Sequence, residues 1–378
     1  MHHRLIRRIL PVILLSCVLC AAALGGCSFG RKAPSKSSSK AAKTSKAADK
    51  KTAAAKPAVD VNLSAAGDCT LGVDSRYSTN FNSVYQRHGA AYFLEQVRDV
   101  FGADDLTLVN LEGTLTTSTD RADKTFTFKG PAKYTDILKD GHVDAVTLAN
   151  NHSHDFGETG FTDTQAALDN ADIPYFGYDT IATLRVKGEK FALIGLNGLE
   201  DPSETTLTKC IARAKKQKPD AIVVYYHWGI ERNPMPEAYE TALAKTAIDH
   251  GADLVLGSHP HVVQGIERYK GRYIVYSLGN FCFGGNTNPS DKDSMIFQLT
   301  FHFEDGKLTA TNNAKVLPCS ISSSSSTNDF QPRVLTGSEG SRVLNKISTR
   351  SRTWGISVDS DGTVQTSDHT TAQTSAAQ

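Results

Sequence analysis

Residues 221–261 read AIVVYYHWGIERNPMPEAYETALAKTAIDHGADLVLGSHPH, a segment in which two apolar runs flank a helical pattern. The first apolar run leads up to His227, the helical pattern covers residues 236–250, and the second apolar run leads up to His259. This order predicts two parallel strands joined by a helix. Ligands of open α/β sheets bind beyond the carboxyl ends of such strands, so we expect both histidines at one edge of a sheet.

The same alternation extends over most of the chain. Apolar strands are also expected at residues 61–66, 106–111, 145–149 and 191–196, with helical patterns at 90–101, 134–139, 162–170 and 205–216. Three later segments, at 272–276, 294–303 and 307–315, are strands joined by turns and indicate an antiparallel portion or a second sheet. The sequence therefore predicts an α/β fold with a largely parallel sheet.

The first 26 residues have the pattern of a secretory signal peptide, with a basic start, an apolar run and then small residues. The run ends at Leu24-Gly25-Gly26-Cys27, which resembles a bacterial lipobox, where Cys27 would be lipidated and become the mature N-terminus. The alternative is a signal peptide or short anchor that contains a cysteine by chance. In either case the chain leaves the cytoplasm, and we expect an extracytoplasmic protein that is lipid-anchored to the cell membrane.

Residues 27–60 are rich in Lys, Ala and Ser and have almost nothing to bury, so we expect a disordered tether. Of the 41 Lys and Arg and the 40 Asp and Glu residues, 12 and 2 respectively lie within residues 1–60. Residues 61–378 therefore hold 29 basic and 38 acidic residues, a net charge of −9. The basic tether would attract anionic lipid headgroups or cell-wall polymers, or its lysines would only keep it soluble and extended.

We place the folded domain at residues 61–318 and treat residues 319–378 as a C-terminal extension that is partly disordered. This extension contains a serine run at 322–326, and its last residues, from Thr370, have the composition of a disordered end. Four cysteines lie outside the signal and the lipid site: Cys69, Cys210, Cys282 and Cys319. Their spacing is not that of a metal finger, and the sequence leaves open whether they form disulfides.

Side chains that can bind a metal or transfer a proton follow five of the expected strands. They are Asp68, Glu112, Asn151 with His152, His227, and His259 with His261. In an open α/β sheet, loops at the carboxyl ends of strands meet even when they are far apart in sequence. Carboxylates, imidazoles and an amide oxygen, without a thiolate, suit a divalent ion such as Mn, Zn or Fe.

Each of these features has an ordinary structural explanation when it is taken alone. An aspartate at the end of a strand often caps a helix or forms a turn, and a histidine beside Trp228 is often a packed, hydrogen-bonded ring. The His259-Pro260-His261 segment is the strongest single element, because side chains two apart on an extended chain point the same way. Five elements at one topological position favour a shared metal site.

Six motifs occur in order along the chain: GDCTLG (67–72), NLEG (110–113), LANNHSHDFG (148–157), HWGIE (227–231), GSHPHVVQ (257–264) and YSLGNF (276–281). Together they resemble the CapA family of capsule or poly-γ-glutamate synthesis proteins, which is itself similar to the calcineurin-like metallophosphoesterases. The resemblance covers roughly residues 61–285. It implies an α/β fold that is a four-layer α/β/β/α sandwich of the metallo-dependent phosphatase type, with its site at one sheet edge.

The resemblance also implies a set of metal ligands. One site is complete, with the ligands Asp68, Glu112, Asn151, His227 and His259. A second site would share the two carboxylates and use His261, but it lacks an imidazole because Thr70 replaces the histidine of the Asp-x-His pattern. We therefore expect one divalent ion, with a second ion weak or absent.

His152 would stand near the leaving group as a general acid, according to the same resemblance. Its alternative role is to hold a loop beside the site. Asp155 and His154 would orient His152 or a ligand, or Asp155 would form the turn before Gly157, and Asn280 would shape the wall of the site.

Three functions are consistent with the sequence. The first is a cell-surface, metal-dependent hydrolase or transferase-like component of capsule or poly-γ-glutamate synthesis or export, acting on a phosphodiester or a γ-glutamyl amide. The second is a non-catalytic binding or scaffold subunit of a membrane capsule-synthase complex, and the third is an exported metal-dependent phosphoesterase. The expected partners are the membrane, through the lipid anchor, membrane subunits of a capsule synthase and an anionic polymer, with no nucleic acid.

Overall fold

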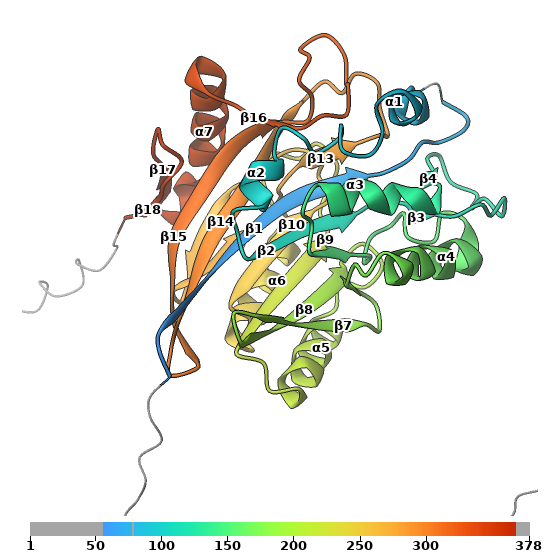
Figure 1. Cartoon of the computed structure of the whole chain (residues 1–378). Helices are drawn as coiled ribbons and strands as arrows, with labels where there is room; N and C mark the ends of the chain where they lie inside the picture. The colour runs from blue at the N-terminus through green and yellow to red at the C-terminus, as the bar shows by residue number, and fades with distance from the viewer. Residues whose placement is uncertain (1–55, 78, 368–378) are drawn as a thin grey trace, which may run out of the picture. The chain divides into compact units, whose positions relative to one another are not determined.

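Residues 56–77 and 79–367 are described by the computed structural model, and they form two stacked β-sheets with helices on the outer faces (Figure 1). The predicted signal peptide, the lipid site Cys27 and the tether up to residue 55 lie outside the described residues. The first strand begins at Val59, two residues before the predicted start of the domain. Among the described residues, no helix is both long enough and apolar enough to cross a bilayer.

The first sheet has eight strands, in the order β16-β15-β14-β1-β2-β5-β6, with β13 paired to the end of β1. Strands β1, β2, β5, β6 and β13 are parallel to one another, whereas β14, β15 and β16 form an antiparallel portion that joins β1 through β14. The strands are β1 (Val59–Thr70), β2 (Leu106–Leu111), β5 (Ala145–Thr147), β6 (Tyr175–Phe176), β13 (Asn280–Phe283), β14 (Asp293–Glu304), β15 (Lys307–Ser320) and β16 (Arg333–Val334).

The second sheet has six strands in the order β11-β12-β10-β9-β8-β7, and only its edge strands β7 and β11 are antiparallel. Its strands are β7 (Ile181–Val186), β8 (Glu189–Asn197), β9 (Ala221–His227), β10 (Leu254–Ser258), β11 (Ile266–Tyr269) and β12 (Arg272–Val275). Two small sheets pair β3 (Thr114–Leu115) with β4 (Lys129–Gly130), and β17 (Ile356–Val358) with β18 (Val364–Thr366). The predicted parallel strands and the predicted antiparallel portion are thus both present.

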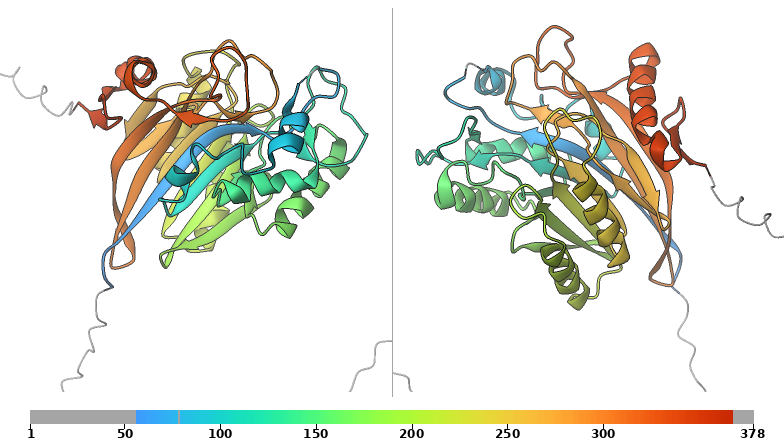
Figure 2. Two further views of the ribbon diagram at one scale, coloured as in Figure 1. Left: turned by 45° about the horizontal axis from the view of Figure 1, so that its top comes forward. Right: turned by 180° about the vertical axis from the view of Figure 1, so that it is seen from behind.

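Helices cover the outer face of each sheet, as the two views of Figure 2 show. Helices α1, α3 and α4 lie with α2 on the first sheet, and α5 and α6 lie on the second. The helices are α1 (Phe81–His88), α2 (Arg98–Phe101), α3 (Thr135–Asp140), α4 (Gly157–Asn170), α5 (Glu204–Lys216), α6 (Ala238–Asp249) and α7 (Gly337–Ser351), with 3-10 turns η1 (Ala132–Tyr134) and η2 (Arg352–Trp354).

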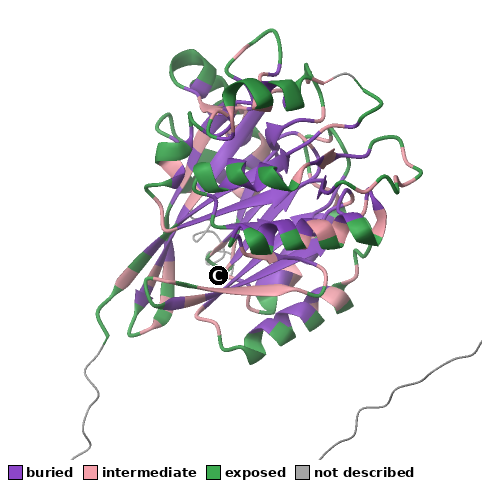
Figure 3. Cartoon of the chain, turned by 45° about the vertical axis from the view of Figure 1, so that its right-hand side comes forward, coloured by how far each residue is buried: buried purple, intermediate pink, exposed green. Residues whose placement is uncertain are grey.

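Three buried apolar clusters separate the four layers, and the strands are buried along most of their length (Figure 3). In β9, Val223 and Tyr225 belong to the cluster between the two sheets, whereas Val224 and Tyr226 pack under the outer helices. Side chains of a strand alternate between its faces, so a strand that is covered on both faces is apolar throughout. The predicted four-layer α/β/β/α sandwich is therefore confirmed.

The segment at residues 90–101 differs from its predicted helix. Only α2 is helical, and the preceding residues form turns with bonds between residues three apart, such as Phe93 N to Ala90 O at 3.2 Å. Phe93, Val97 and Phe101 are nevertheless buried in the outer core of the first sheet. The apolar periodicity therefore identified the buried residues correctly. It did not distinguish a helix from consecutive turns with hydrogen bonds between residues three apart, which can bury the same side chains.

The C-terminal region is built into the sandwich. The predicted boundary between residues 318 and 319 falls inside β15, and α7 buries Val343, Leu344 and Ile347 in the core between the sheets. Arg342 also donates two hydrogen bonds of 2.6 Å to the carboxylate of Asp293 on β14. Regular structure thus continues to β18, and the residues from 368 onward lie outside the described part of the chain.

Strand β1 changes partners at Gly67, and this change shapes the site. Up to Ala65 the strand pairs with β14, whereas from Asp68 onward it pairs with β13. A Cβ atom on Gly67 would lie 1.8 Å from the carbonyl oxygen of Gly279, so only glycine permits this approach. The exchange brings Asn280, at the start of β13, beside Asp68.

The four cysteines of the described residues are all buried and unpaired. Cys69 packs with Cys282 in the outer core of the first sheet, because it points to the opposite face from Asp68. Cys69 therefore has a packing role and is not part of the site.

The side chains that α7 buries should contribute to the stability of the fold. Replacing Ile347, which is fully buried, with alanine should lower the free energy of unfolding by about 3 kcal/mol, because it leaves a cavity in the core between the sheets. Asn345→Ala, on the exposed side of the same helix, should change it by less than about 0.5 kcal/mol. Urea unfolding of the two variants measures both effects, and equal stabilities would mean that α7 is not part of the cooperative fold.

Candidate metal centre

The carboxyl ends of parallel strands from both sheets meet at one edge of the sandwich. Asp68 comes from β1 and Glu112 directly follows β2, while His227 ends β9 in the other sheet. His227 lies between the two carboxylates, with Nδ1 3.9 Å from Asp68 Oδ1 and Nε2 3.7 Å from Glu112 Oε1. All three side chains are fully buried, so the two sheets together enclose a pair of carboxylates beside an imidazole.

Asp68, Glu112 and His261 are close enough to share one metal ion. One ligand atom from each lies within 4.8 Å of the other two. His261 Nδ1 is 3.3 Å from Asp68 Oδ2, and its Nε2 is 3.9 Å from Glu112 Oε1. The resemblance assigned His261 to the weaker second site, whereas the structure places it in the tightest group of potential ligands.

The other three predicted ligands surround this group. His227 Nε2 is 2.8 Å from Asn151 Oδ1, and the ring of His259 lies 4.8 Å from that of His227. The backbone N–H of His259 donates to Asp68 Oδ2 at 3.3 Å. The structure thus brings together all six predicted metal ligands, although they come from five separate segments of the chain.

Two buried polar atoms of this cluster have no hydrogen-bond partner among the described residues. They are Oε1 of Glu112 and Nδ1 of His259. A buried acceptor without a partner destabilises the fold by about 1–3 kcal/mol, and more when it is charged. A metal ion would satisfy both atoms, since a carboxylate oxygen and an imidazole nitrogen are ordinary ligands of Mn, Zn and Fe. The donor set therefore fits a divalent cation.

The histidines differ in their charge. Burial, together with the neighbouring imidazoles, lowers the pKa of His227 well below its ordinary value and that of His259 to about 4. Both rings are therefore neutral at pH 7, which is the form that binds a metal. Burial would also lower the pKa of His261, but the carboxylates of Glu112 and Asp68 outweigh it and raise the pKa to about 10.

The pKa values of the two carboxylates shift in opposite directions. Burial and the charge of Asp68 raise the pKa of Glu112. Burial would raise the pKa of Asp68 as well, but the hydrogen bond with His261 and the nearby imidazoles hold it well below its ordinary value. A positive charge is thus required beside the pair, and the proton on His261 supplies it in the absence of a metal.

The backbone of the His259-Pro260-His261 segment is not extended, contrary to the geometry predicted for it. The φ angles of the two histidines are +98° and +56°, values that non-glycine residues rarely adopt. The backbone N–H of Arg232 holds the turn by donating to the carbonyl oxygen of Pro260 at 2.8 Å. Left-handed conformations of this kind are costly and concentrate at functional sites.

Thr70 stands where the related phosphoesterase pattern has a histidine. Its hydroxyl donates to Glu112 Oε2 at 2.7 Å. This bond orients the carboxylate and leaves Oε1 as the free acceptor that faces His261. The substitution thus removes one imidazole ligand and adds a hydrogen bond that positions Glu112.

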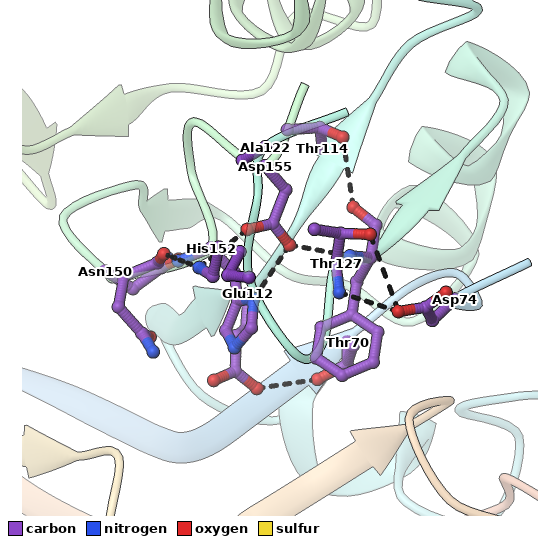
Figure 4. A network of polar contacts seen from close by, with 12 residues as sticks. Thr70, Asp74, Glu112, Thr114, Ala122, Thr127, Asn150, His152 and Asp155 are labelled. Atoms are coloured by element: carbon purple, nitrogen blue, oxygen red, sulfur yellow. Dashed lines mark hydrogen bonds and ion pairs between the residues drawn. The ribbon is translucent and has the colours of Figure 1, made fainter. Parts of the chain in front are cut away.

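Asp155 orients His152, which decides between the two roles predicted for that aspartate. Asp155 Oδ2 lies 2.7 Å from His152 Nδ1 (Figure 4). The same oxygen accepts from the backbone N–H of Phe128 at 2.6 Å. The other oxygen of this fully buried carboxylate accepts from Lys124 Nζ at 2.8 Å. With Nδ1 engaged, His152 has only Nε2 left for exchange with a ligand.

Two asparagines that the sequence analysis did not assign support the metal cluster. Asn110 Nδ2 donates to Asp68 Oδ1 at 2.7 Å, and Asn150 Nδ2 donates to Asn110 Oδ1 at 3.0 Å. Both lie in motifs at strand ends, and this position could have marked them in the sequence as residues of the site. Lys124 had no such signal in the sequence, because its loop is far along the chain from Asn151 and Asp155, the two residues that its Nζ contacts.

A four-layer α/β/β/α sandwich with carboxylates and imidazoles at the carboxyl ends of its strands defines a metallophosphatase-type fold. The family model described as "Bacterial capsule synthesis protein PGA_cap" matches residues 62–285. The chain therefore belongs to this family of bacterial capsule synthesis proteins.

Three relatives show how far the similarity extends. The capsule biosynthesis protein CapA of Bacillus anthracis is 30% identical over 264 residues, 62% of this chain and 64% of that protein. The PGA biosynthesis protein CapA of Bacillus subtilis strain 168 is 32% identical over 285 residues, 69% of this chain and 72% of that protein. A probable polyglutamine synthesis accessory protein of Mycobacterium tuberculosis is 31% identical over 217 residues, 47% of this chain and 55% of that protein.

A buried carboxyl group lies beneath the loop that follows His227. Glu240 is fully buried on α6, and its Oε1 has no partner among the described residues. A Cβ atom on Gly229 would lie 2.8 Å from this oxygen, so the carboxyl group packs directly against the loop. Burial raises the pKa of Glu240 to about 7.

This pKa predicts a pH-dependent stability. The folded protein binds the proton of Glu240 more tightly than the unfolded chain, so the resulting stabilisation is complete below pH 4.5 and is lost as the pH rises through 7. In Glu240→Gln, the loss of unfolding free energy between pH 5 and pH 8 should be smaller than in the wild type by about 2 kcal/mol. Urea unfolding at both pH values measures this difference. The exposed variant Glu95→Gln should follow the wild type, and the same result for Glu240→Gln would contradict the prediction.

Proposed function

We propose that the protein is an extracytoplasmic, lipid-anchored component of capsule or poly-γ-glutamate synthesis or export, and that it uses one divalent metal ion. The observation that carries the metal site is the buried pair Asp68 and Glu112 with His261 between them, where Glu112 Oε1 has no other partner. The role in capsule synthesis is supported by the family to which the chain belongs and by the names of its relatives in two Bacillus species.

The proposed location rests on the N-terminal sequence pattern. A signal peptide over residues 1–26 would direct export, and lipid on Cys27 would retain the protein at the membrane surface. The Lys-rich segment after the cysteine would place the folded domain near membrane subunits of a synthase and near an anionic polymer. The acidic domain would need its metal or a local cation to contact such a polymer, because like charges repel.

The ligands of the metal would be Asp68, Glu112, Asn151, His227, His259 and His261. Binding would release the proton of His261, so the affinity for the metal should fall as the pH is lowered. When bound, a divalent ion lowers the pKa of water and polarises a carbonyl or phosphoryl oxygen. The ion would be Mn, Zn or Fe, and Thr70 leaves a second ion short of one imidazole.

His152 is the residue that would transfer a proton. It lines the same cavity as His261, and Asp155 holds its Nδ1, so Nε2 is the atom available to a leaving group. The reaction supported by this arrangement is metal-dependent hydrolysis or transfer at a γ-glutamyl amide or a phosphodiester.

A non-catalytic role has one specific observation in its favour, which is Thr70. A related phosphoesterase would have a second imidazole there, and a hydroxyl bound to Glu112 cannot replace it as a strong ligand. In this second candidate function, the metal stabilises a surface that binds the polymer or the membrane subunits of a capsule synthase.

The metal content of the full chain tests the site. We expect about one equivalent of Mn, Zn or Fe by mass spectrometry, and its loss in Glu112→Gln and in His259→Ala, since each variant removes a ligand with a buried orphan atom. His250→Ala, an exposed histidine at the end of α6, should retain the metal. No bound metal after loading with each of the three ions would refute the proposed site.

Activity separates the two candidate functions. If the site is catalytic, His152→Ala should lower the rate of hydrolysis of γ-glutamyl polymer or phosphodiester by at least about 100-fold, because a general acid contributes about that much. The variant should keep its metal. If His152→Ala instead supports normal capsule formation in cells and changes no hydrolysis rate, while Glu112→Gln abolishes capsule, the non-catalytic role is correct.

A further inference from the structure

The loop of residues 229–236 lies between β9 and α6, beside a cavity of about 160 Å³ that opens at the metal cluster (Figure 1). Glu231 and Arg232 of this loop line the cavity, together with His152 and His261. The loop contains no helix or strand, and its residue Ile230 is 55% exposed. The position of the loop therefore sets how far the cavity is open to solvent.

Backbone hydrogen bonds hold the loop against its neighbours. The N–H of Gly229 donates to the hydroxyl of Tyr239 at 2.6 Å, and the N–H of Arg232 donates to the carbonyl oxygen of Pro260 at 2.8 Å. The φ angles of Gly229 and Arg232 are +87° and +64°, both in the left-handed region. A short exposed segment that depends on such contacts opens at a lower free energy than the strands beside it.

The carboxyl group of Glu240 lies directly beneath this loop. It is fully buried on α6, its Oε2 accepts from the backbone N–H of Glu237 at 2.6 Å, and its Oε1 has no hydrogen-bond partner among the described residues. A Cβ atom on Gly229 would lie between 2.8 and 3.0 Å from all three atoms of the carboxyl group. The backbone of the loop thus rests on this group and leaves no room for a side chain between them.

The polar groups around Glu240 would not compensate a negative charge on it. On α6 its neighbours are Glu237, which is a like charge, and Tyr239. Tyr276, which directly follows β12, also lies near it and donates to Glu267 Oε2 at 2.6 Å. Burial and the charge of Glu237 raise the pKa of Glu240 to about 7, so the protonated form is the one that suits the closed loop.

The cations of this region are engaged elsewhere. Lys245, on the same helix, pairs with Glu267 at 3.2 Å, and Arg232 lines the cavity. In the described part of the chain, Glu240 takes part in no ion pair. An ionised carboxylate that stays buried without a partner is strongly unfavourable, so ionisation of this group requires that water reach it.

The loop is the direct route for that water. Tyr276, on one side of Glu240, belongs to the buried apolar cluster under α6. Gly229, on another side, belongs to a loop whose following residues, 230–232, are exposed. Displacing the loop therefore hydrates the carboxyl group without disturbing the packed core.

We propose that the loop of residues 229–236 is a pH-dependent lid of the cavity, which is closed while Glu240 is protonated and opens when Glu240 ionises. Opening would separate Arg232 from Pro260 and remove two residues of the cavity wall. For a protein outside the cytoplasm, the pH of the medium would then control access to the cavity. The lid goes beyond the proposed function, because it depends neither on a bound metal nor on the reaction.

The direction of the pH dependence follows from the two states of the lid. The closed form binds the proton of Glu240 more tightly than the open form, in which the carboxyl group is hydrated. Closure is therefore favoured most below pH 4.5, and this preference is lost as the pH rises through 7.

Distances between two nitroxide spin labels test the lid, measured by double electron–electron resonance on the full chain in detergent from pH 5 to pH 8. One label is attached through Ile230→Cys on the loop and the other through Lys209→Cys, at an exposed position of α5. We expect a narrow distance distribution at pH 5 that is shifted and broadened at pH 8. The four cysteines of the described residues are buried, and the chain without introduced cysteines gives the background labelling.

A second pair of labels and two variants serve as controls. Lys209→Cys with Asn345→Cys joins α5 to α7, and its distance distribution should not change with pH. In Glu240→Gln the loop pair should keep its pH 5 distribution at pH 8, because an amide of the same size cannot ionise. The exposed variant Glu95→Gln should follow the wild type.

Three results would overturn the proposal. They are a loop distance that does not change with pH in the wild type, the same change in Glu240→Gln, and an equal change in the control pair, which would mean that the whole domain loosens. If Glu240→Gln does not fold, the wild-type series decides, since a change confined to the loop pair supports the lid and any other result contradicts it.

Discussion

Two carboxylates buried side by side require a positive charge, and the site is arranged around this requirement. Asp68 and Glu112 are fully removed from water, where like charges repel strongly and neither is hydrated. His261 meets the requirement with a proton in the metal-free chain, and a divalent ion would meet it more completely. His227 and His259 are neutral mainly because they are buried, and the neighbouring imidazoles lower their pKa values further.

The fold places this pair by means of adjacent parallel strands. β1 and β2 are neighbours, so Asp68 and the residue after β2 lie at the same edge of the first sheet. His227 ends β9 and the other two imidazole ligands directly follow β10, both in the second sheet, which faces the first across a largely apolar core. Neither sheet alone contains a complete ligand set, so metal binding would depend on the stacking of the two.

A polar network also connects the metal cluster with the cavity that His152 and His261 line. Asp155 binds His152 through one contact and the backbone of Phe128 through another, and Asp74 fixes the next residue, Thr127. His152 and the backbone of residues 127 and 128 are therefore held by two buried carboxylates, those of Asp74 and Asp155.

The sequence by itself determined the alternation of strands and helices and the chemical types at the site, whereas the four layers were implied by the resemblance to the CapA family. Apolar runs and helical spacing reflect burial of each segment, which is a local property, and the donors at the strand ends could be named from the same reading, although the turns at residues 90–97 and helix α7 were missed. Only the tertiary structure decided that His261 lies closest to the carboxylates, that Thr70 orients Glu112, and that Asn110, Lys124 and Arg232 support or line the site. These relations depend on the register between two sheets and on loops that cross between them, and such long-range distances leave no periodic signal in the chain.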